Sequence, residues 1–238
     1  MENQFERTEL LIGAAGIKKL ADSTVAIFGV GGVGGFATEA LARSGVGHLI
    51  LVDADAVAVS NINRQIIATH ATVGKNKVDV MKERILDINP ACEVEAYPVF
   101  YSESSKASFD FSKYDYVIDA IDTLESKIDL ILTAKAAATP IISSMGAGNK
   151  LNPTLFKVSD ISKTSVCPLA RAVRNRLKKA GVFKGLKVVY SEEAPVGKRE
   201  SGTPVGSIAF VPSVAGLILA AEVVKDLTQN QAHSADCL

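Results

Sequence analysis

Apolar and polar positions follow a regular order along the first 150 residues, in which short apolar runs are separated by longer amphipathic stretches. Short runs bounded by glycine or polar residues are typical of strands buried on both faces, and apolar residues three or four positions apart are typical of helices. The pattern predicts strands at 24–30, 48–53, 93–99, 114–122 and 140–145. It predicts helices at 36–47, 75–90 and 124–139, preceded by one helix or a pair of helices at 5–20.

The pattern changes after about residue 150. It predicts strands at 154–160 and 186–193, helices at 168–181 and 213–227, and a polar segment at 198–206 that fits a lid or an ordinary surface loop equally well. The alternation predicts an α/β fold with a doubly wound, mostly parallel, Rossmann-like sheet and helices on both faces. We expect one domain over 1–238, with a nucleotide-binding half at about 20–150, a substrate-facing half at about 151–228 and a polar tail at 229–238.

Composition narrows the class of protein further. The formal net charge is zero, which argues against binding of nucleic acid through the charge of the whole chain. Three scattered cysteines, Cys92, Cys167 and Cys237, form no C-x-x-C pair, so neither a disulfide scaffold nor a four-cysteine zinc site is expected. No signal-peptide pattern is present, and the apolar stretch near the end has 14 residues, too few to span a membrane. We expect a soluble cytoplasmic protein without a membrane partner.

A glycine-rich loop follows the first predicted strand. The motif G29-V-G31-G32-V-G34 fits a phosphate-binding turn, in which backbone N–H groups at the start of a helix face the phosphates. Asp53, at the end of the second strand, has the position of an acid that hydrogen bonds a ribose. These residues alone fit NAD and ATP equally well, so an NAD-binding oxidoreductase stays open at this point.

The residues after the second strand favour ATP. Arg64 can donate two parallel hydrogen bonds to phosphate oxygens, and Lys77 adds a point charge at the start of the next helix. Asp122 ends the strand at 114–122, at the edge of the sheet where ligands bind, and a carboxylate there can hold Mg²⁺. An enzyme that cleaves ATP between the α- and β-phosphates needs these groups, whereas an NAD site does not.

Taken in order, these motifs resemble the ATP-binding pattern of the superfamily of ubiquitin-activating enzymes and the ThiF and MoeB proteins. The motifs span about 25–145: G29-V-G31-G32-V-G34, D53-A-D55, S60-N61-I-N63-R64-Q65, G74-K75-N-K77 and D119-A-I-D122. The resemblance implies adenylation of a substrate carboxylate with release of pyrophosphate. It implies Asp53 on the ribose, Arg64 and Lys77 on the phosphates and Asp122 on Mg²⁺, these last three being the catalytic residues. The remaining implied ATP-site residues are Gly29, Gly31, Gly32, Gly34, Asp55, Asn61, Asn63 and Gln65. It also implies a homodimer in which Arg7 reaches the phosphates of the partner subunit.

The second half resembles one branch of this superfamily, the tRNA threonylcarbamoyladenosine dehydratases. The segments that carry this resemblance are VIDAIDTLESKIDLI and SSMGAGNKLNPTLFKVSDISKTSVCPLARAVRNRLKK. It implies that the carboxylate belongs to a threonylcarbamoyl group on a tRNA adenosine, and that adenylation is followed by closure of a hydantoin ring and release of AMP. The alternative is activation of the C-terminus of a ubiquitin-like or sulfur-carrier protein, which the lack of C-x-x-C pairs disfavours. A sulfur-transfer protein is a further possible partner.

A basic segment supports an RNA substrate. From Ile161 to Tyr190 the chain has eight Lys or Arg residues and no acid. Helical spacing turns Leu169, Val173 and Leu177 inward and a set of basic side chains outward. A solvated helix surface is the alternative explanation of this pattern. With the resemblance, the pattern predicts these tRNA-binding residues: Lys163, Arg171, Arg174, Arg176, Lys178 and Lys179.

Two questions stay open at the level of sequence. Lys150 and Lys163 are both candidates to meet the substrate carboxylate. Cys167, at the start of the basic helix, is either a nucleophile or a small helix-start residue, and ring closure without a covalent relay favours the second. Members of the resembling branch tend to have an aspartate at the position of Cys167, so any catalytic role there is in doubt.

Overall fold

The computed structural model describes residues 3–197 and 205–229, and most of the segment 198–206 and of the tail 229–238 lies outside these ranges. Seven strands are present in the described residues: β1 (Thr24–Phe28), β2 (His48–Val52), β3 (Glu93–Tyr97), β4 (Tyr116–Asp119), β5 (Ile141–Ser144), β6 (Phe156–Asp160) and β7 (Lys187–Ser191). The α-helices of the same residues are α1 (Glu6–Ala21), α2 (Gly34–Ser44), α3 (Lys77–Ile88), α4 (Leu124–Ala136), α5 (Pro168–Lys179) and α6 (Phe210–Gln229). Each predicted strand and helix is confirmed, with ends that differ by a few residues.

The strands form one sheet in the order β3-β2-β1-β4-β5-β7-β6. All neighbouring pairs are parallel except β6 and β7, which pair antiparallel from Phe156 opposite Ser191 to Asp160 opposite Lys187. The order reverses at β1, because the chain continues to β2 on one side and later returns to β4 on the other. In open α/β sheets, such a reversal forms a crevice at the carboxyl ends of the strands, where ligands bind. The predicted α/β fold with a mostly parallel sheet is therefore confirmed.

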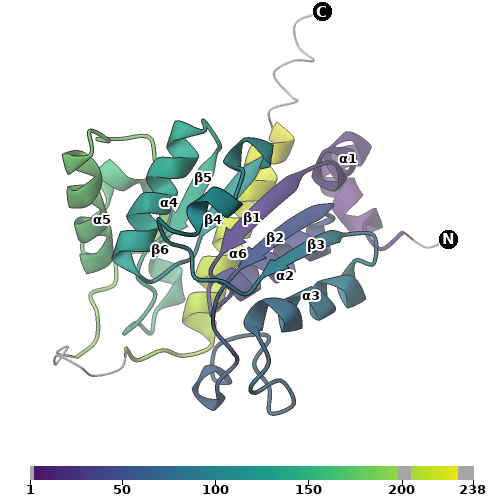
Figure 1. Cartoon of the computed structure of the whole chain (residues 1–238), viewed down its shortest axis with the longest axis horizontal. Coiled ribbons are helices and arrows are strands. Elements are labelled where there is room, and N and C mark those ends of the chain that lie inside the picture. Colours follow the sequence, from purple (N-terminus) through teal and green to yellow (C-terminus); the bar gives the residue numbers. More distant parts are fainter. Residues whose placement is uncertain (1–2, 198–204, 230–238) are drawn as a thin grey trace, which may run out of the picture.

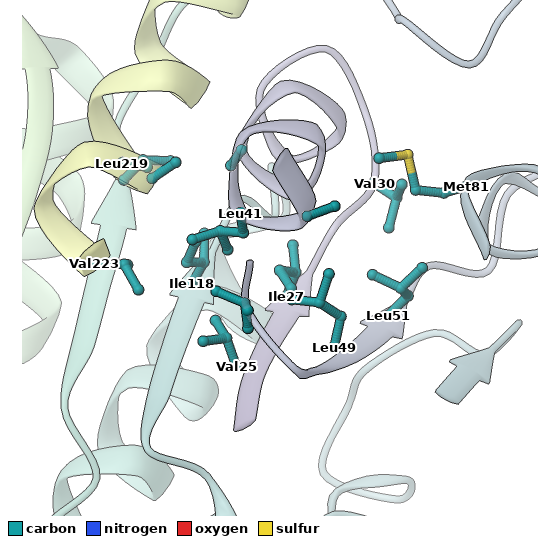
Figure 2. Packing of buried hydrophobic residues seen from close by; sticks show 14 of the residues in the cluster. Val25, Ile27, Val30, Leu41, Leu49, Leu51, Met81, Ile118, Leu219 and Val223 are labelled. Atoms are coloured by element: carbon teal, nitrogen blue, oxygen red, sulfur yellow. The ribbon is translucent and has the colours of Figure 1, made fainter. Parts of the chain in front are cut away.

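Alternate residues of each strand enter two separate cores. Val25 and Ile27 of β1 pack with α2, α3 and α6, whereas Ala26 and Phe28 pack with α4 and α5. Figure 2 shows part of the first core, in which Leu41 of α2 and Leu219 and Val223 of α6 lie over the strand residues of one face of the sheet. Burial on both faces explains why the parallel strands appear in the sequence as continuous apolar runs. The two helical layers can be followed in Figure 1.

The first helix bends near its middle. Gly13 of α1 has φ +71° and ψ 168°, which are not helical values, so two helical pieces meet at this residue. This geometry reconciles the two predicted alternatives, one helix or a pair. The C-terminal helix α6 is apolar along much of its length and packs against α1 and α2. In the residues that the structure describes, no helix is long and apolar enough to cross a membrane.

Candidate active site

The glycine loop after β1 is shaped by two close backbone contacts. Gly29 has φ +92°, and a Cβ at this residue would lie 2.7 Å from the carbonyl oxygen of Ala120. A Cβ on Gly34 would lie 1.8 Å from the carbonyl oxygen of Gly29. Only glycine fits at both positions, so the loop turns tightly and α2 starts at the carboxyl end of β1. The N–H groups of Gly35 and Ala37 donate to the carbonyl oxygens of Gly31 and Val33, and the other N–H groups of the first turn are suited to face an anion.

Two acids after β2 hold a lysine from α3. The Asp53 carboxylate accepts hydrogen bonds from the backbone N–H of Val30 at 2.7 Å and of Asp55 at 2.9 Å. The Lys77 ammonium lies 2.6 Å from the Asp55 carboxylate and 3.8 Å from that of Asp53. Lys77 is only 5% exposed, so its charge is directed into the site rather than into solvent. Asp53 therefore links the glycine loop to Lys77.

Arg64 lies beside the glycine loop. Its guanidinium donates to the carbonyl oxygen of Ser60 and to Oδ1 of Asn63, both at 2.8 Å. Asn63 in turn donates to the carbonyl oxygen of Ser207, which precedes α6. No carboxylate pairs with Arg64 within residues 3–197 and 205–229, so neutral oxygens orient it while its charge stays uncompensated. A guanidinium in this state is suited to bind phosphate.

The amides of the same segment differ in their roles. Asn61 accepts a hydrogen bond from the backbone N–H of Ala58 through Oδ1, which closes the turn around the short helix η1 (Val59–Asn61). Gln65 is 7% exposed, and its Oε1 is buried without a partner in the described part of the chain. A buried amide oxygen without a partner is unfavourable. Gln65 therefore has an acceptor available for a donor on a ligand in the adjacent cleft.

Asp122 and Asp119 lie at the end of β4 in contrasting environments. Asp122 is exposed, and its carboxylate receives one long contact, from Oγ1 of Thr123 at 3.4 Å. Asp119 is fully buried and forms an ion pair at 2.8 Å with Lys127, which is also fully buried. Asp122 is thus available to a cation in the cleft, whereas Asp119 is already neutralised.

The Asp119–Lys127 pair joins three elements under the cleft. Oγ of Ser143 on β5 donates to Asp119 at 2.5 Å, and Lys127 of α4 donates to the carbonyl oxygen of Ser144 at 3.0 Å. The segment D-A-I-D-x-x-x-x-K contains both Asp119 and Lys127, but no pattern of apolar and polar residues indicates that the lysine pairs with the acid at the end of β4. Sequence reasoning did not include this pair.

One cleft connects these groups along the carboxyl ends of the strands. Its volume is about 730 Å³, within the range of small-molecule sites. The predicted ATP-site residues that line it are Gly29, Gly31, Gly32, Asp53, Asp55, Asn61, Arg64, Gln65, Lys77 and Asp122. Three predicted residues do not line it: Gly34 packs against Gly29, Asn63 orients Arg64, and Arg7 is exposed on α1.

The other end of the cleft is formed by residues after β5 and at the start of α5. Lys150 and Cys167 line it with Gly146, and both are buried, at 4% and 2% exposure. Burial lowers the pKa of the Lys150 ammonium, while Cys167 and Glu193 act in the opposite direction. Cys167 is the N-cap residue of α5, as a small helix-start residue would be. The other candidate for the substrate carboxylate, Lys163, is exposed and does not line the cleft.

The predicted basic surface is centred on α5, with two residues placed differently from expectation. Val173 and Leu177 are fully buried, as predicted, whereas Leu169 is partly exposed and lines the cleft. Arg174 does not project freely, because it donates to Oγ1 and the carbonyl oxygen of Thr164 at 2.6 and 2.8 Å. Arg176 lies 3.6 Å from Glu125 of α4 in an exposed pair. Of the six predicted tRNA-binding residues, four are exposed and form no ion pair with the described residues: Lys163, Arg171, Lys178 and Lys179.

Comparison with known proteins agrees with this fold and cleft. Residues 5–237 match the family model described as the ThiF family, and the chain belongs to this family. Among its relatives is the tRNA threonylcarbamoyladenosine dehydratase of Bacillus subtilis, which is 50% identical over 245 residues, covering 97% of this chain and 96% of the relative. The Escherichia coli protein of the same name is 41% identical over 207 residues, covering 84% of this chain and 77% of that protein.

Solved structures of a tRNA threonylcarbamoyladenosine dehydratase have the same fold as this chain. The E. coli dehydratase in complex with AMP superposes with a TM-score of 0.91 and 37% identity, covering 97% of this chain and 96% of that one. The same protein in complex with ATP superposes with a TM-score of 0.89 and 36% identity, with the same coverage. The family predicted from the sequence motifs is confirmed, and its sheet has the architecture found here.

Proposed function

We propose that this protein is an ATP-dependent tRNA threonylcarbamoyladenosine dehydratase. The observation that carries the proposal is a single cleft that contains the residues of an ATP site, in a chain 50% identical over nearly its full length to the B. subtilis dehydratase. The E. coli dehydratase, which has been crystallised with ATP and with AMP, supports ATP as the nucleotide.

Adenylation requires a carboxylate to approach the α-phosphate of ATP. A carboxylate oxygen attacks the α-phosphorus, the bond to the β-phosphate oxygen breaks, and pyrophosphate leaves. In our proposal Arg64 and Lys77 stabilise the negative charge on the phosphates, the N-terminus of α2 adds backbone N–H groups, and Asp53 binds the ribose. The exposed Asp122 fits as a ligand of Mg²⁺, which would neutralise part of the triphosphate charge.

Ring closure depends on the proximity of the attacking nitrogen to the adenylated carboxyl group. The adenylated carboxyl carbon is attacked by N6 of the modified adenosine, the nitrogen whose attack closes a five-membered ring, and N6 loses its proton as AMP departs. Because both reacting groups belong to one modified nucleoside, the enzyme mainly holds the threonylcarbamoyl group in a bent conformation and excludes water. The substrate loses the elements of one water, and ATP is converted to AMP and pyrophosphate.

The tRNA would contact the surface around α5. Lys163, Arg171, Lys178 and Lys179 are exposed basic residues on α5 or just before it, and the N-terminal end of α5 lines the cleft. Arg174 and Arg176 belong to the same surface and contact Thr164 and Glu125. Charge reversal of Arg171 and Lys178 together should weaken tRNA binding and reduce its salt dependence, while ATP affinity stays unchanged. Unchanged tRNA affinity would leave α5 as a solvated surface.

Further parts of the proposal concern the assembly. We propose a homodimer in which Arg7, exposed on α1, reaches the phosphates of the partner subunit, and a location in the cytoplasm with its tRNA substrate. A sulfur-transfer protein is proposed as an additional partner. Activation of a ubiquitin-like or sulfur-carrier protein is the less supported alternative.

The deciding experiment is one incubation of the purified protein with Mg-ATP and tRNA that bears threonylcarbamoyladenosine. Mass spectrometry of the digested nucleosides should show the loss of one water from that nucleoside, and AMP should form only when this tRNA is present. If the nucleoside keeps its mass, the dehydratase proposal fails, and adenylation of a small protein with a Gly-Gly C-terminus becomes the reaction to test.

A further inference from the structure

Lys150 is a buried cation that forms no ion pair with the described residues. The residue is 4% exposed, lines the far end of the cleft, and donates a hydrogen bond to the backbone carbonyl oxygen of Glu193. The Glu193 carboxylate acts on Lys150 only at longer range, and it accepts the backbone N–H groups of Leu151 and Asn152, each at 2.9 Å. An ammonium group has three donors, so two stay available to a ligand.

The cost of burying this charge indicates what ligand would suit it. An ionised group removed from water is unfavourable unless an opposite charge and hydrogen bonds compensate it. Burial lowers the pKa of Lys150, which is consistent with an incompletely compensated ammonium. An anion that entered the cleft and accepted the remaining donors would remove this penalty.

The backbone before Lys150 is held in place. Asn149 has φ +55°, and its N–H donates to the carbonyl oxygen of Gly206 at 2.7 Å. Its side-chain oxygen accepts the N–H of Gly206, and its carbonyl oxygen accepts that of Val196, both at 2.7 Å. These bonds fix the position from which the Lys150 side chain enters the cleft. A group fixed in this way loses less entropy when it binds a ligand.

We propose that Lys150 binds the carboxylate of the threonylcarbamoyl group and thereby distinguishes modified from unmodified tRNA, an inference that rests on the function proposed above. The groups proposed to bind phosphate, Arg64 and Lys77, follow β2, whereas Lys150 follows β5, and all three line the same cleft. Two anions, the carboxylate and the α-phosphate, must come together for adenylation. A cation on the carboxylate side offsets their repulsion, which is strongest in a site that excludes water.

The test compares the affinity of the protein for two tRNAs that differ only in the threonylcarbamoyl group. Lys150→Met keeps an unbranched side chain of similar length and removes the charge, and Lys150→Gln serves as a second variant if the first does not fold. The matched control is Lys113→Met, since Lys113 is exposed, precedes β4 and lies at the amino ends of the strands. Circular dichroism would confirm folding of each variant.

We expect the wild-type protein to prefer the modified tRNA and Lys150→Met to lose about tenfold to a hundredfold of that preference, as a lost charge-assisted hydrogen bond requires. Affinity for unmodified tRNA and for ATP should not change, and Lys113→Met should behave as the wild type. An unchanged preference in Lys150→Met overturns the inference. So does a fall in ATP affinity with the preference intact, because Lys150 would then belong to the nucleotide site.

The same assay separates the failure of the inference from the failure of the proposed function. If the wild type dehydrates the modified nucleoside and Lys150→Met does so with unchanged KM, only the role of Lys150 is wrong. If the wild type neither prefers nor dehydrates the modified tRNA, both the proposed function and this inference fail.

Discussion

The lysines at the two ends of the cleft differ in whether they are paired with an acid. At the nucleotide end, Lys77 lies 2.6 Å from Asp55, and at the far end Lys150 is buried, with a carbonyl oxygen as its hydrogen-bond partner in the described part of the chain. A ligand that binds Lys77 must compete with the carboxylate of Asp55. A ligand that binds Lys150 accepts hydrogen bonds from an ammonium group that has no ion pair in the described residues. The first arrangement suits a polyanion that brings its own metal ion, and the second suits a single carboxylate. The comparison suggests that burial and pairing, more than residue type, assign these lysines their roles.

The largest expected effect is on stability, and it should be seen at Lys127, the paired lysine beneath the cleft, but not at Lys150. Lys127→Met should lower the free energy of unfolding by about 3–5 kcal/mol, because it leaves the fully buried Asp119 carboxylate without its counter-ion. Lys150→Met should change the free energy of unfolding by less than about 1 kcal/mol, since Lys150 forms no ion pair with the described residues and the Glu193 charge acts on it only at longer range. Urea denaturation of the two variants measures both values.

A double variant checks the reason for this contrast. Asp119→Asn combined with Lys127→Met removes both charges and should recover a large part of the loss caused by Lys127→Met alone. Equal stability of Lys127→Met and the wild type would show that the buried pair is not a source of stability.

The next effect concerns the nucleotide end. Arg64→Ala should lower the rate of AMP formation by about 10²–10³-fold, because a preorganised donor to the phosphates is lost. The fold should remain intact, since Arg64 contacts only a carbonyl and an amide oxygen of its own segment. AMP release during turnover measures the rate, and near-wild-type turnover would remove Arg64 from the phosphate site.

The smallest effect is a pH dependence at the far end. Burial lowers the pKa of Lys150, with the Cys167 thiol of α5 and Glu193 after β7 as the neighbouring groups that counteract it. The ammonium form binds the carboxylate, so the preference for modified tRNA should be complete below this pKa and should fall as the pH rises through it. The loss should begin at lower pH than an ordinary lysine, with a pKa of about 10.4, would allow.

The control for the pH dependence is Lys150→Met. This variant should show a flat ratio of the two tRNA affinities between neutral pH and about pH 10. A wild-type ratio that stays constant over the same range would contradict the expected titration of Lys150.

Much of this fold could be predicted from the sequence, because strands buried on both faces and amphipathic helices leave strong periodic signals. The motif residues were also expected to lie together, and most of them line one cleft, since the carboxyl ends of β1, β2 and β4 meet at one edge of the sheet. What could not be predicted depends on contacts between distant residues. The sequence left Lys150 and Lys163 as equal candidates, and only the structure shows that Lys150 is buried in the cleft whereas Lys163 is exposed outside it. Arg174 has an outward helical position, yet it bonds to Thr164 ten residues earlier.

The position of α6 at the end of the described chain has a consequence for how the protein reaches its native state during synthesis. Val211, Leu219 and Val223 of this helix cover the side of the sheet formed by Val25 and Ile118 (Figure 2). The strands precede α6 in the sequence and are synthesised first. One apolar face of the sheet therefore stays exposed until residues 210–229 leave the ribosome. A nascent chain that contains every phosphate-binding residue still exposes this surface. Stable folding of the nucleotide-binding half is thus coupled to the synthesis of α6.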